Sequence, residues 1–314
     1  MSCEISRKAY INLSIKKIGK KIIRHWQLYI LLLPPLIFLF VFKYYPMYGV
    51  QIAFRDFNPS LGITKSPWAG FKFFSLFFNS PQFSKLIINT ISISFYSILA
   101  GFPIPIILAI FLNECKNKFF SKTVQMITYA PYFISTVILV AMINQMTSPY
   151  GMINNVLTLL GLDTVNFMGK SSWFTSIYVW SGVWQGAGYS SVIYLAALSG
   201  ISSELYEAAR IDGASTFKKI IHIDIPGIMP TVVILLILSS ASVLNVGYEK
   251  IYLMQNPLNL HVSEVISTYV YKIGLVSAQY SYSSAIGLFN SLVSLIVLTV
   301  VNQVAKKVSE TSLW

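Results

Sequence analysis

The sequence predicts an all-α integral membrane protein with six transmembrane helices. Of its 314 residues, 55% are hydrophobic and 11% are charged, and the mean hydropathy is +0.64. Soluble domains carry about 25% charged residues, so this composition fits a bilayer better than water. A spanning helix needs about 20 mostly apolar residues. Six stretches satisfy this requirement, at residues 28–50, 86–112, 124–146, 173–198, 227–248 and 284–304.

The distribution of positive charge predicts the orientation of these helices. An even number of spans places both termini on one side of the membrane. If that side is the cytoplasm, 15 of the 23 Lys and Arg residues face it, seven of them before Leu28. This asymmetry follows the positive-inside rule. The net charge of +12 therefore reflects topology, and we expect contact with membrane lipid and none with nucleic acid.

The chain is expected to form one membrane domain over residues 28–305. A basic cytoplasmic segment, 1–27, precedes it and a short cytoplasmic tail, 306–314, follows it. The first apolar stretch follows basic residues as a signal peptide would, but no site of small residues comes after it. An uncleaved first span is therefore predicted. Cys3 and Cys115 both fall on the cytoplasmic side, where no disulfide is expected.

The loop at residues 201–226 begins with a predicted helix that has one apolar face. Ile201, Leu205, Ala208 and Ala209 recur at spacings of four, three and one residues, which places them on one side of a helix. The two alanines are small enough to let another surface come close. This face is therefore a candidate contact surface.

A turn and a second helix are predicted in the rest of this loop. Gly213 follows Asp212 and can adopt a positive φ at no steric cost, so we expect it to end the first helix. A second helix fits residues 216–224. Pro226 is expected to end that helix and to begin the next apolar stretch.

The same loop carries the pattern Glu-Ala-Ala, three residues, Gly, nine residues and Ile-x-Ile-Pro. Its fixed positions are Glu207, Ala208, Ala209, Gly213, Ile223 and Pro226. The pattern resembles the EAA loop of permeases from ATP-binding-cassette (ABC) importers. Only Ile225 departs from it, where leucine is usual, and this exchange conserves volume.

The resemblance implies a cytoplasmic elbow, a helix-turn-helix that docks into a cleft of a separate ATPase subunit. Glu207 would then pair with a basic residue of that subunit. Ala208 and Ala209 would fill the cleft, and Gly213 would set the angle between the helices.

The resemblance extends over residues 29–314 and is strongest to sugar permeases for complex oligosaccharides and polysaccharides. Further matching segments lie at 103–105, 112–114, 129–135, 184–188, 284–290 and 312–314. The resemblance implies the fold of a type I importer permease in a bacterial cell membrane. It also implies a second homologous permease, two ABC ATPase subunits, an extracellular sugar-binding protein and an oligosaccharide substrate.

No catalytic or cofactor site is predicted. Gly169, Lys170 and Ser171 resemble the end of a phosphate-binding loop, but Thr164 stands where the first glycine should be. The three histidines are far apart in the sequence, which makes a metal site improbable. We expect this chain to be no enzyme, with ATP and Mg²⁺ bound on the partner ATPase subunits.

Polar and aromatic residues of the spans are candidates for the sugar path. Such groups are expensive in a bilayer, and sugars are bound by aromatic faces together with Asn, Gln and acidic side chains. The candidates are Trp184, Gln185, Tyr189, Asn245, Tyr248, Glu249 and Asn290. For the amides, hydrogen bonds between helices are an open alternative. Tyr248 is expected to stack on a sugar ring and Glu249 to bond its hydroxyls.

Together these features favour the permease subunit of an ATP-driven importer of complex sugars. A permease of the same family for another solute remains open. A secondary transporter would need carboxylates within the spans, which hold essentially none. A membrane scaffold without transport activity would not explain the elbow.

Overall fold

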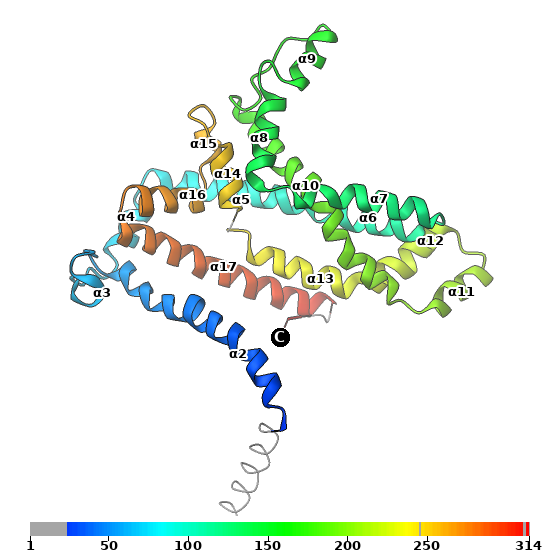
Figure 1. The fold of residues 1–314 in the computed structure, drawn as a ribbon, viewed down its shortest axis with the longest axis horizontal. Coiled ribbons are helices and arrows are strands. Elements are labelled where there is room, and N and C mark those ends of the chain that lie inside the picture. The colour runs from blue at the N-terminus through cyan, green and yellow to red at the C-terminus, as the bar shows by residue number, and fades with distance from the viewer. Residues whose placement is uncertain (1–23, 245, 310–311, 314) are drawn as a thin grey trace, which may run out of the picture. The chain divides into compact units, whose positions relative to one another are not determined.

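The computed structural model describes residues 24–244, 246–309 and 312–313, and every regular element in these ranges is a helix (Figure 1). The chain divides after Trp68 into two compact units, Met1–Trp68 and Ala69–Trp314. The single domain at residues 28–305 therefore stays a prediction.

The first unit is a long helix followed by a folded loop. The helix runs through α2 (Trp26–Leu39), the π-helical turn η1 (Phe40–Tyr44) and the 3₁₀ segment η2 (Tyr45–Phe54). A short helix, α3 (Gly62–Lys65), follows. Arg55 closes the loop, because its Nη1 donates to the carbonyl oxygens of Thr64 at 3.0 Å and Ser66 at 2.8 Å.

The second unit is built around one long central helix, α10. It packs against α5, α6, α7 and α13. The elements are α4 (Lys72–Phe78), α5 (Gln82–Gly101), α6 (Pro103–Glu114), α7 (Lys118–Tyr129), η3 (Ala130–Phe133), α8 (Thr136–Thr147), α9 (Met152–Leu159), α10 (Ser171–Ser199), α11 (Ser203–Ile211), α12 (Thr216–Lys219), η4 (Ile220–Asp224), α13 (Ile225–Ala241), α14 (Tyr248–Met254), α15 (Leu260–Ser263), α16 (Ile266–Tyr271), η5 (Lys272–Val276) and α17 (Tyr280–Ser309).

Two apolar clusters hold α10 in place. Phe174 of α10 is buried with Ile251 of α14 and Val265, just before α16. Further along α10, Leu198 packs with Ala109 of α6, and Ile228 of α13 belongs to the same cluster. The central helix therefore joins segments far apart in the sequence.

Four helices are long and apolar enough to cross a membrane, counted over the described ranges. They are Trp26–Phe54, Gln82–Glu114, Thr216–Ala241 and Tyr280–Lys307. A fifth crossing results if the helical pair Lys118–Phe133 and Thr136–Leu159, bent by 97°, spans as one unit. The prediction of several membrane helices is thus supported, but the count of six is not confirmed.

Two predicted spans differ from the helices observed. The stretch 124–146 is broken between η3 and α8, where Pro131 lies in η3 and the Ser135 side chain caps α8 by accepting from the Ile138 N–H. The stretch 227–248 ends early, since α13 stops at Ala241. Serine side chains near that end bond backbone carbonyls, and Tyr248 begins α14 instead.

The predicted stretch 173–198 lies within α10, which is an unbroken helix of 29 residues. It contains many Ser, Gly and aromatic residues and is not among the four apolar helices above. Gly188 explains part of this composition. A Cβ at this position would lie 2.1 Å from the carbonyl oxygen of Thr128, so the glycine allows α7 to approach α10 closely.

We expect Gly188→Ala to destabilise the protein. The added methyl group must push the backbone of α7 away from α10, which costs about 1–3 kcal/mol. Thermal unfolding of the purified protein in detergent measures the change. The matched control is Gly186→Ala, because a Cβ at Gly186 meets no atom within 4 Å. This control should leave stability unchanged or raise it by up to about 1 kcal/mol. Equal melting temperatures for the two variants would contradict the close approach.

Candidate functional site

The elbow between α10 and α13 begins with α11, whose two ends are capped. The Ser202 side chain accepts a hydrogen bond from the backbone N–H of Glu204. At the other end the N–H of Ala214 donates to the Ala209 carbonyl at 2.9 Å, and Gly213 has φ +67°. This is the left-handed glycine cap that the sequence predicted. The turn at Gly213 is therefore confirmed.

The second helix of the elbow continues into the next apolar helix. The N–H of Ile225 bonds to the carbonyl of Ile220, five residues earlier, so a π-helical turn precedes Pro226. Proline lacks an N–H and disfavours regular helix before it, and the wider turn accommodates its ring. The prediction that Pro226 ends the second helix is therefore wrong. Residues Thr216–Ala241 form one helix.

A buried carboxylate fixes the first helix of the elbow to the second. Asp224 is 0% exposed, and its Oδ1 accepts a hydrogen bond from the Tyr206 hydroxyl at 2.6 Å. Burial, reinforced by this hydrogen bond, raises the pKa of Tyr206 above its usual value. The phenol thus stays protonated and donates to Asp224.

An ion pair ties the elbow to α6. The Nζ of Lys219 lies 2.6 Å from Oε2 of Glu114, the last residue of α6. The same ammonium lies 5.5 Å from the centre of the Tyr206 ring. Gly227 adds a close backbone contact, since a Cβ there would lie 2.4 Å from Cδ1 of Ile201. Contacts with α6, α11 and the start of α13 therefore hold the base of the elbow.

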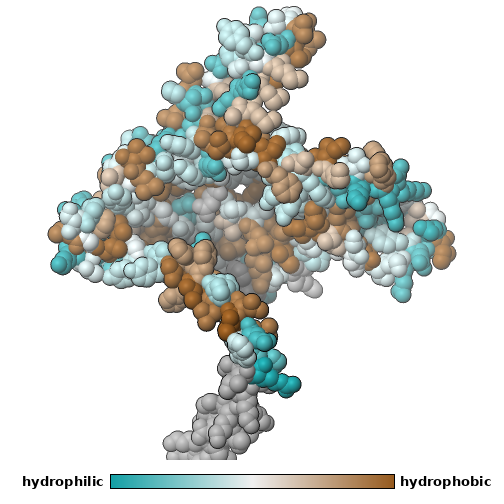
Figure 2. Space-filling model, in the orientation of Figure 1, coloured by the Kyte–Doolittle hydropathy of each residue, from teal (hydrophilic) through white to brown (hydrophobic). Residues whose placement is uncertain are grey.

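The outer surface of the elbow is exposed and partly apolar. Ile211 is 86% exposed and Phe217 71%, and both lie near the turn. In Figure 2 this end of the second unit, at the right, carries brown apolar patches beside teal polar ones. Of the pattern residues, Glu207, Ala208, Gly213 and Pro226 are exposed, while Ala209 and Ile223 are half-buried. Exposed apolar side chains rimmed by charge are typical of a docking surface.

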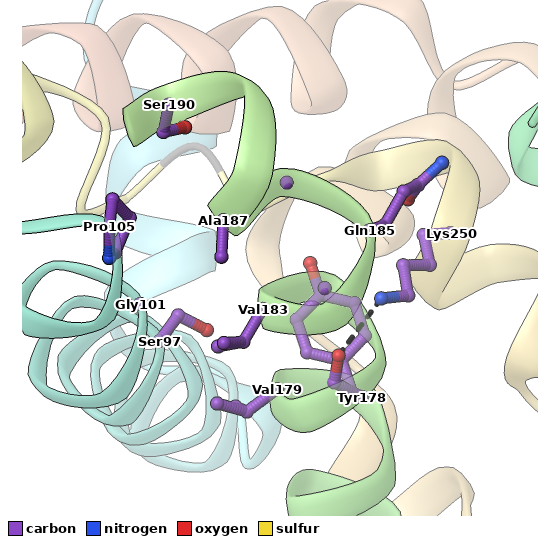
Figure 3. Close-up of a pocket in the computed structure, with 12 residues that line it drawn as sticks. Ser97, Gly101, Pro105, Tyr178, Val179, Val183, Gln185, Ala187, Ser190 and Lys250 are labelled. Atoms are coloured by element: carbon purple, nitrogen blue, oxygen red, sulfur yellow. Dashed lines mark hydrogen bonds between the residues drawn. The ribbon is translucent and has the colours of Figure 1, made fainter. Parts of the chain in front are cut away.

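A second candidate site is a cavity of about 300 Å³ between α5, α6, α10 and α14 (Figure 3). Ser97, Tyr178, Gln185 and Ser190 line it, and Lys250 enters from α14. The Nζ of Lys250 donates to the backbone carbonyl of Tyr178 at 2.9 Å, drawn as a dashed line in Figure 3. A cation and several hydroxyl groups therefore meet in one space.

Two further spaces adjoin this cavity. One of about 330 Å³ and one of about 180 Å³ both have Ser97, Ser239 and Ser242 in their walls. Ser97 is thus common to all three. We call the three spaces together the serine groove, defined by Ser94, Ser97, Ser190, Ser239 and Ser242. Such a polar lining among apolar helices suits a hydrated, polyhydroxylated ligand.

The predicted path residues do not form one site. Gln185 lines the serine groove, and its Nε2 donates to the Ile134 carbonyl at 2.9 Å. Tyr248 lines a separate cavity of about 480 Å³ together with Tyr271 and Tyr280.

The other candidates lie elsewhere. Trp184, Tyr189 and Glu249 are exposed, and Tyr189 stacks on Tyr132 with ring centres 4.0 Å apart. Asn290 is 7% exposed. Asn245 lies outside the described residues.

Sequence reasoning missed Lys250 and the groove serines. Lys250 follows the predicted span 227–248 and is one of the eight Lys and Arg residues outside the predicted cytoplasmic segments, and serines within spans are ordinarily bonded to their own helix. The available signal was a lone lysine next to Glu249, directly after an apolar stretch. Only the packing of α14 against α10 brings it into a cavity.

Comparison with known proteins identifies close relatives. Residues 101–310 match the family described as binding-protein-dependent transport system inner membrane component. Two Bacillus subtilis (strain 168) proteins are 40% identical to this chain. Protein LplB aligns over 288 residues, 91% of each chain. The polygalacturonan/rhamnogalacturonan transport system permease protein YteP aligns over 300 residues, 95% of this chain and 94% of that protein.

Solved structures share the fold. A chain of a bacterial ABC transporter involved in the import of the acidic polysaccharide alginate superposes with a TM-score of 0.86. It is 40% identical, and the match covers 93% of this chain and 99% of that one. A second structure holds a bacterial alginate ABC transporter in complex with an alginate pentasaccharide-bound periplasmic protein. It also gives a TM-score of 0.86 and 40% identity, over 94% of this chain and 99% of that one.

We expect Tyr206→Phe to destabilise the elbow by leaving the buried Asp224 carboxylate without its donor. The loss should lower the free energy of unfolding by about 1–3 kcal/mol. Thermal unfolding of the purified protein measures it, with Tyr150→Phe as control, because Tyr150 is 92% exposed. Adding Asp224→Leu to Tyr206→Phe should recover most of the loss, since both polar partners are then gone. No recovery in the double variant would contradict the pairing.

Proposed function

The chain belongs to the family of binding-protein-dependent transport system inner membrane components, and we propose that it is the permease subunit of an ABC importer for complex oligosaccharides. The family consists of multi-pass membrane transport components and not of enzymes. The observation that carries the proposal is the elbow. Its sequence pattern coincides with a capped helix-turn-helix that presents exposed apolar side chains and is held at its base by buried polar contacts.

The elbow suits the transmission of force from a partner to the membrane helices. ATP-driven closure of a partner ATPase dimer would push on the outer surface of α11 and α12. Because Thr216–Ala241 is one helix, displacement of α12 moves α13 directly. The Lys219–Glu114 ion pair would carry the same displacement to α6. The helices would thus rock between inward-open and outward-open arrangements.

The partners follow from this role. Two ABC ATPase subunits would bind ATP and Mg²⁺, and this chain would bind no nucleotide. A second homologous permease would complete the membrane domain, and an extracellular sugar-binding protein would deliver substrate. The elbow and both termini would face the cytoplasm of a bacterial cell. The solved relative in complex with an alginate pentasaccharide-bound periplasmic protein supports the delivery step.

The names of the relatives support an oligosaccharide substrate. One relative is a polygalacturonan/rhamnogalacturonan transport system permease protein, and another is part of an alginate importer. The serine groove offers hydroxyl groups suited to sugar hydroxyls. We propose Tyr248, which is half-buried and lines a separate cavity, and the exposed Glu249 as further sugar contacts.

Glu207→Ala should uncouple transport while leaving the permease inserted and assembled. An exposed carboxylate that pairs with a basic residue of the ATPase contributes about 1.5–3 kcal/mol, so uptake should fall about ten- to a hundredfold. Uptake of labelled oligosaccharide into vesicles holding the whole complex measures it. Glu204→Ala, one turn earlier on the same helix, is the control and should transport normally. Normal uptake by both variants would contradict the proposed pairing of Glu207 with the ATPase.

Paired substitution of Ile211 and Phe217 by serine should weaken ATPase binding. Each side chain contributes about 1.5–3 kcal/mol when buried at an interface. Losing both should lower affinity by at least about a hundredfold. Co-purification of the ATPase with the permease measures the effect, with Tyr150→Ser as the control at a distant exposed site. Full recovery of the ATPase with the double variant would show that this surface is not the docking surface.

A further inference from the structure

Lys250 is half-buried and reaches into the serine groove. Its Nζ donates to the Tyr178 carbonyl at 2.9 Å and lies 4.8 Å from the centre of the Tyr178 ring. Gly182, one turn along α10, leaves space for it, since a Cβ there would lie 3.3 Å from this Nζ. The ammonium therefore sits against α10 at the wall of the cavity (Figure 3).

Among the residues that the structure describes, no carboxylate pairs with Lys250. The ion pairs Lys219–Glu114 and Lys272–Glu264 do not include it. The neighbouring Glu249 is exposed. Burial lowers the pKa of Lys250 to about 8, so at neutral pH most molecules still carry the charge. A partly desolvated cation bonded only to neutral groups is costly, and an anion would offset that cost.

The groove around Lys250 is polar enough for a sugar chain. Ser97 and Ser190 line the same cavity, and no hydrogen bond within the described ranges uses either hydroxyl. Their hydroxyls are therefore available to a ligand. Hydroxyl groups and one ammonium together match a pyranose that bears a carboxylate.

We propose that Lys250 binds the carboxylate of a uronic-acid residue and selects acidic oligosaccharides for passage through the serine groove. This assignment rests on the proposed transport function. The ammonium donates two further hydrogen bonds beyond the one to Tyr178. A carboxylate accepts them as an opposite charge, which a neutral hydroxyl is not, and this attraction gives the preference for acidic over neutral sugars.

A purely structural role is the rival interpretation. In that role the hydrogen bond from Lys250 to the Tyr178 carbonyl connects α14 to α10, and the ammonium group binds no ligand. The two roles differ in what they predict for substrate preference. Loss of a structural tie lowers uptake of every sugar alike, whereas loss of a carboxylate receptor lowers uptake of acidic sugars selectively.

The test compares two sugars in vesicles that hold the complete importer. The probes are a galacturonate trimer and its carboxyl-reduced, neutral counterpart of equal length. The variants are Lys250→Met, Lys250→Arg and the control Lys85→Gln, which removes a charge from an exposed position of α5. The readout is the ratio of acidic to neutral uptake. Comparing ratios between variants cancels any selection by the binding protein, which is the same in every vesicle.

We expect the ratio to fall about ten- to a hundredfold in Lys250→Met and to stay close to wild type in Lys250→Arg and Lys85→Gln. Complete inactivity of Lys250→Met beside an active, acid-selective Lys250→Arg also supports the assignment, because the charge is then what matters. An unchanged ratio in Lys250→Met, or loss of both sugars in both Lys250 variants, overturns it. Wild-type uptake without acidic preference overturns it and leaves the transport function standing. If the wild-type importer takes up neither sugar, the proposed transport function is overturned as well.

Discussion

The burial of one carboxylate at the base of the elbow constrains the rest of this helix-turn-helix. Asp224 has no exposed surface, and Tyr206 is its hydrogen-bond donor. A buried carboxylate that loses its donor is costly, so α11 must stay folded back onto the helix that contains Asp224. Since that helix runs on to Ala241, the second helix of the elbow and the apolar helix α13 are parts of one continuous helix. The proposed docking surface can stay exposed because these contacts hold its base in place.

The sequence predicted the turn of the elbow because its cause is local. Gly213 adopts a positive φ that few other residues reach at low cost, and the surrounding caps come from neighbouring residues. The prediction that Pro226 ends the second helix was wrong for a reason that is also local but less common. The preceding π-helical turn, in which the N–H of Ile225 reaches the carbonyl of Ile220, lets a helix pass through a proline.

The serine groove could not be predicted, because packing and not sequence spacing creates it. Ser97, Ser190 and Ser242 come from α5, α10 and the end of α13, and no periodicity links them. Lys250 likewise enters only because the tertiary packing of α14 brings its Nζ to the Tyr178 carbonyl of α10. The break near Ser135 was predictable in principle, since a capping serine follows Pro131, but apolar composition alone made the stretch appear continuous.

If the permease works as proposed, another subunit covers the exposed surface of the elbow in the assembled importer. The direct measurement places a single cysteine at Ile211, in a chain whose Cys3 and Cys115 are replaced by serine, and follows its reaction with a water-soluble maleimide in inside-out membrane vesicles. We expect rapid labelling when the permease is produced alone and strong protection when the ATPase is produced with it. Equal labelling in both preparations, with the complex shown to be assembled, would mean that the elbow is not the surface to which the ATPase binds.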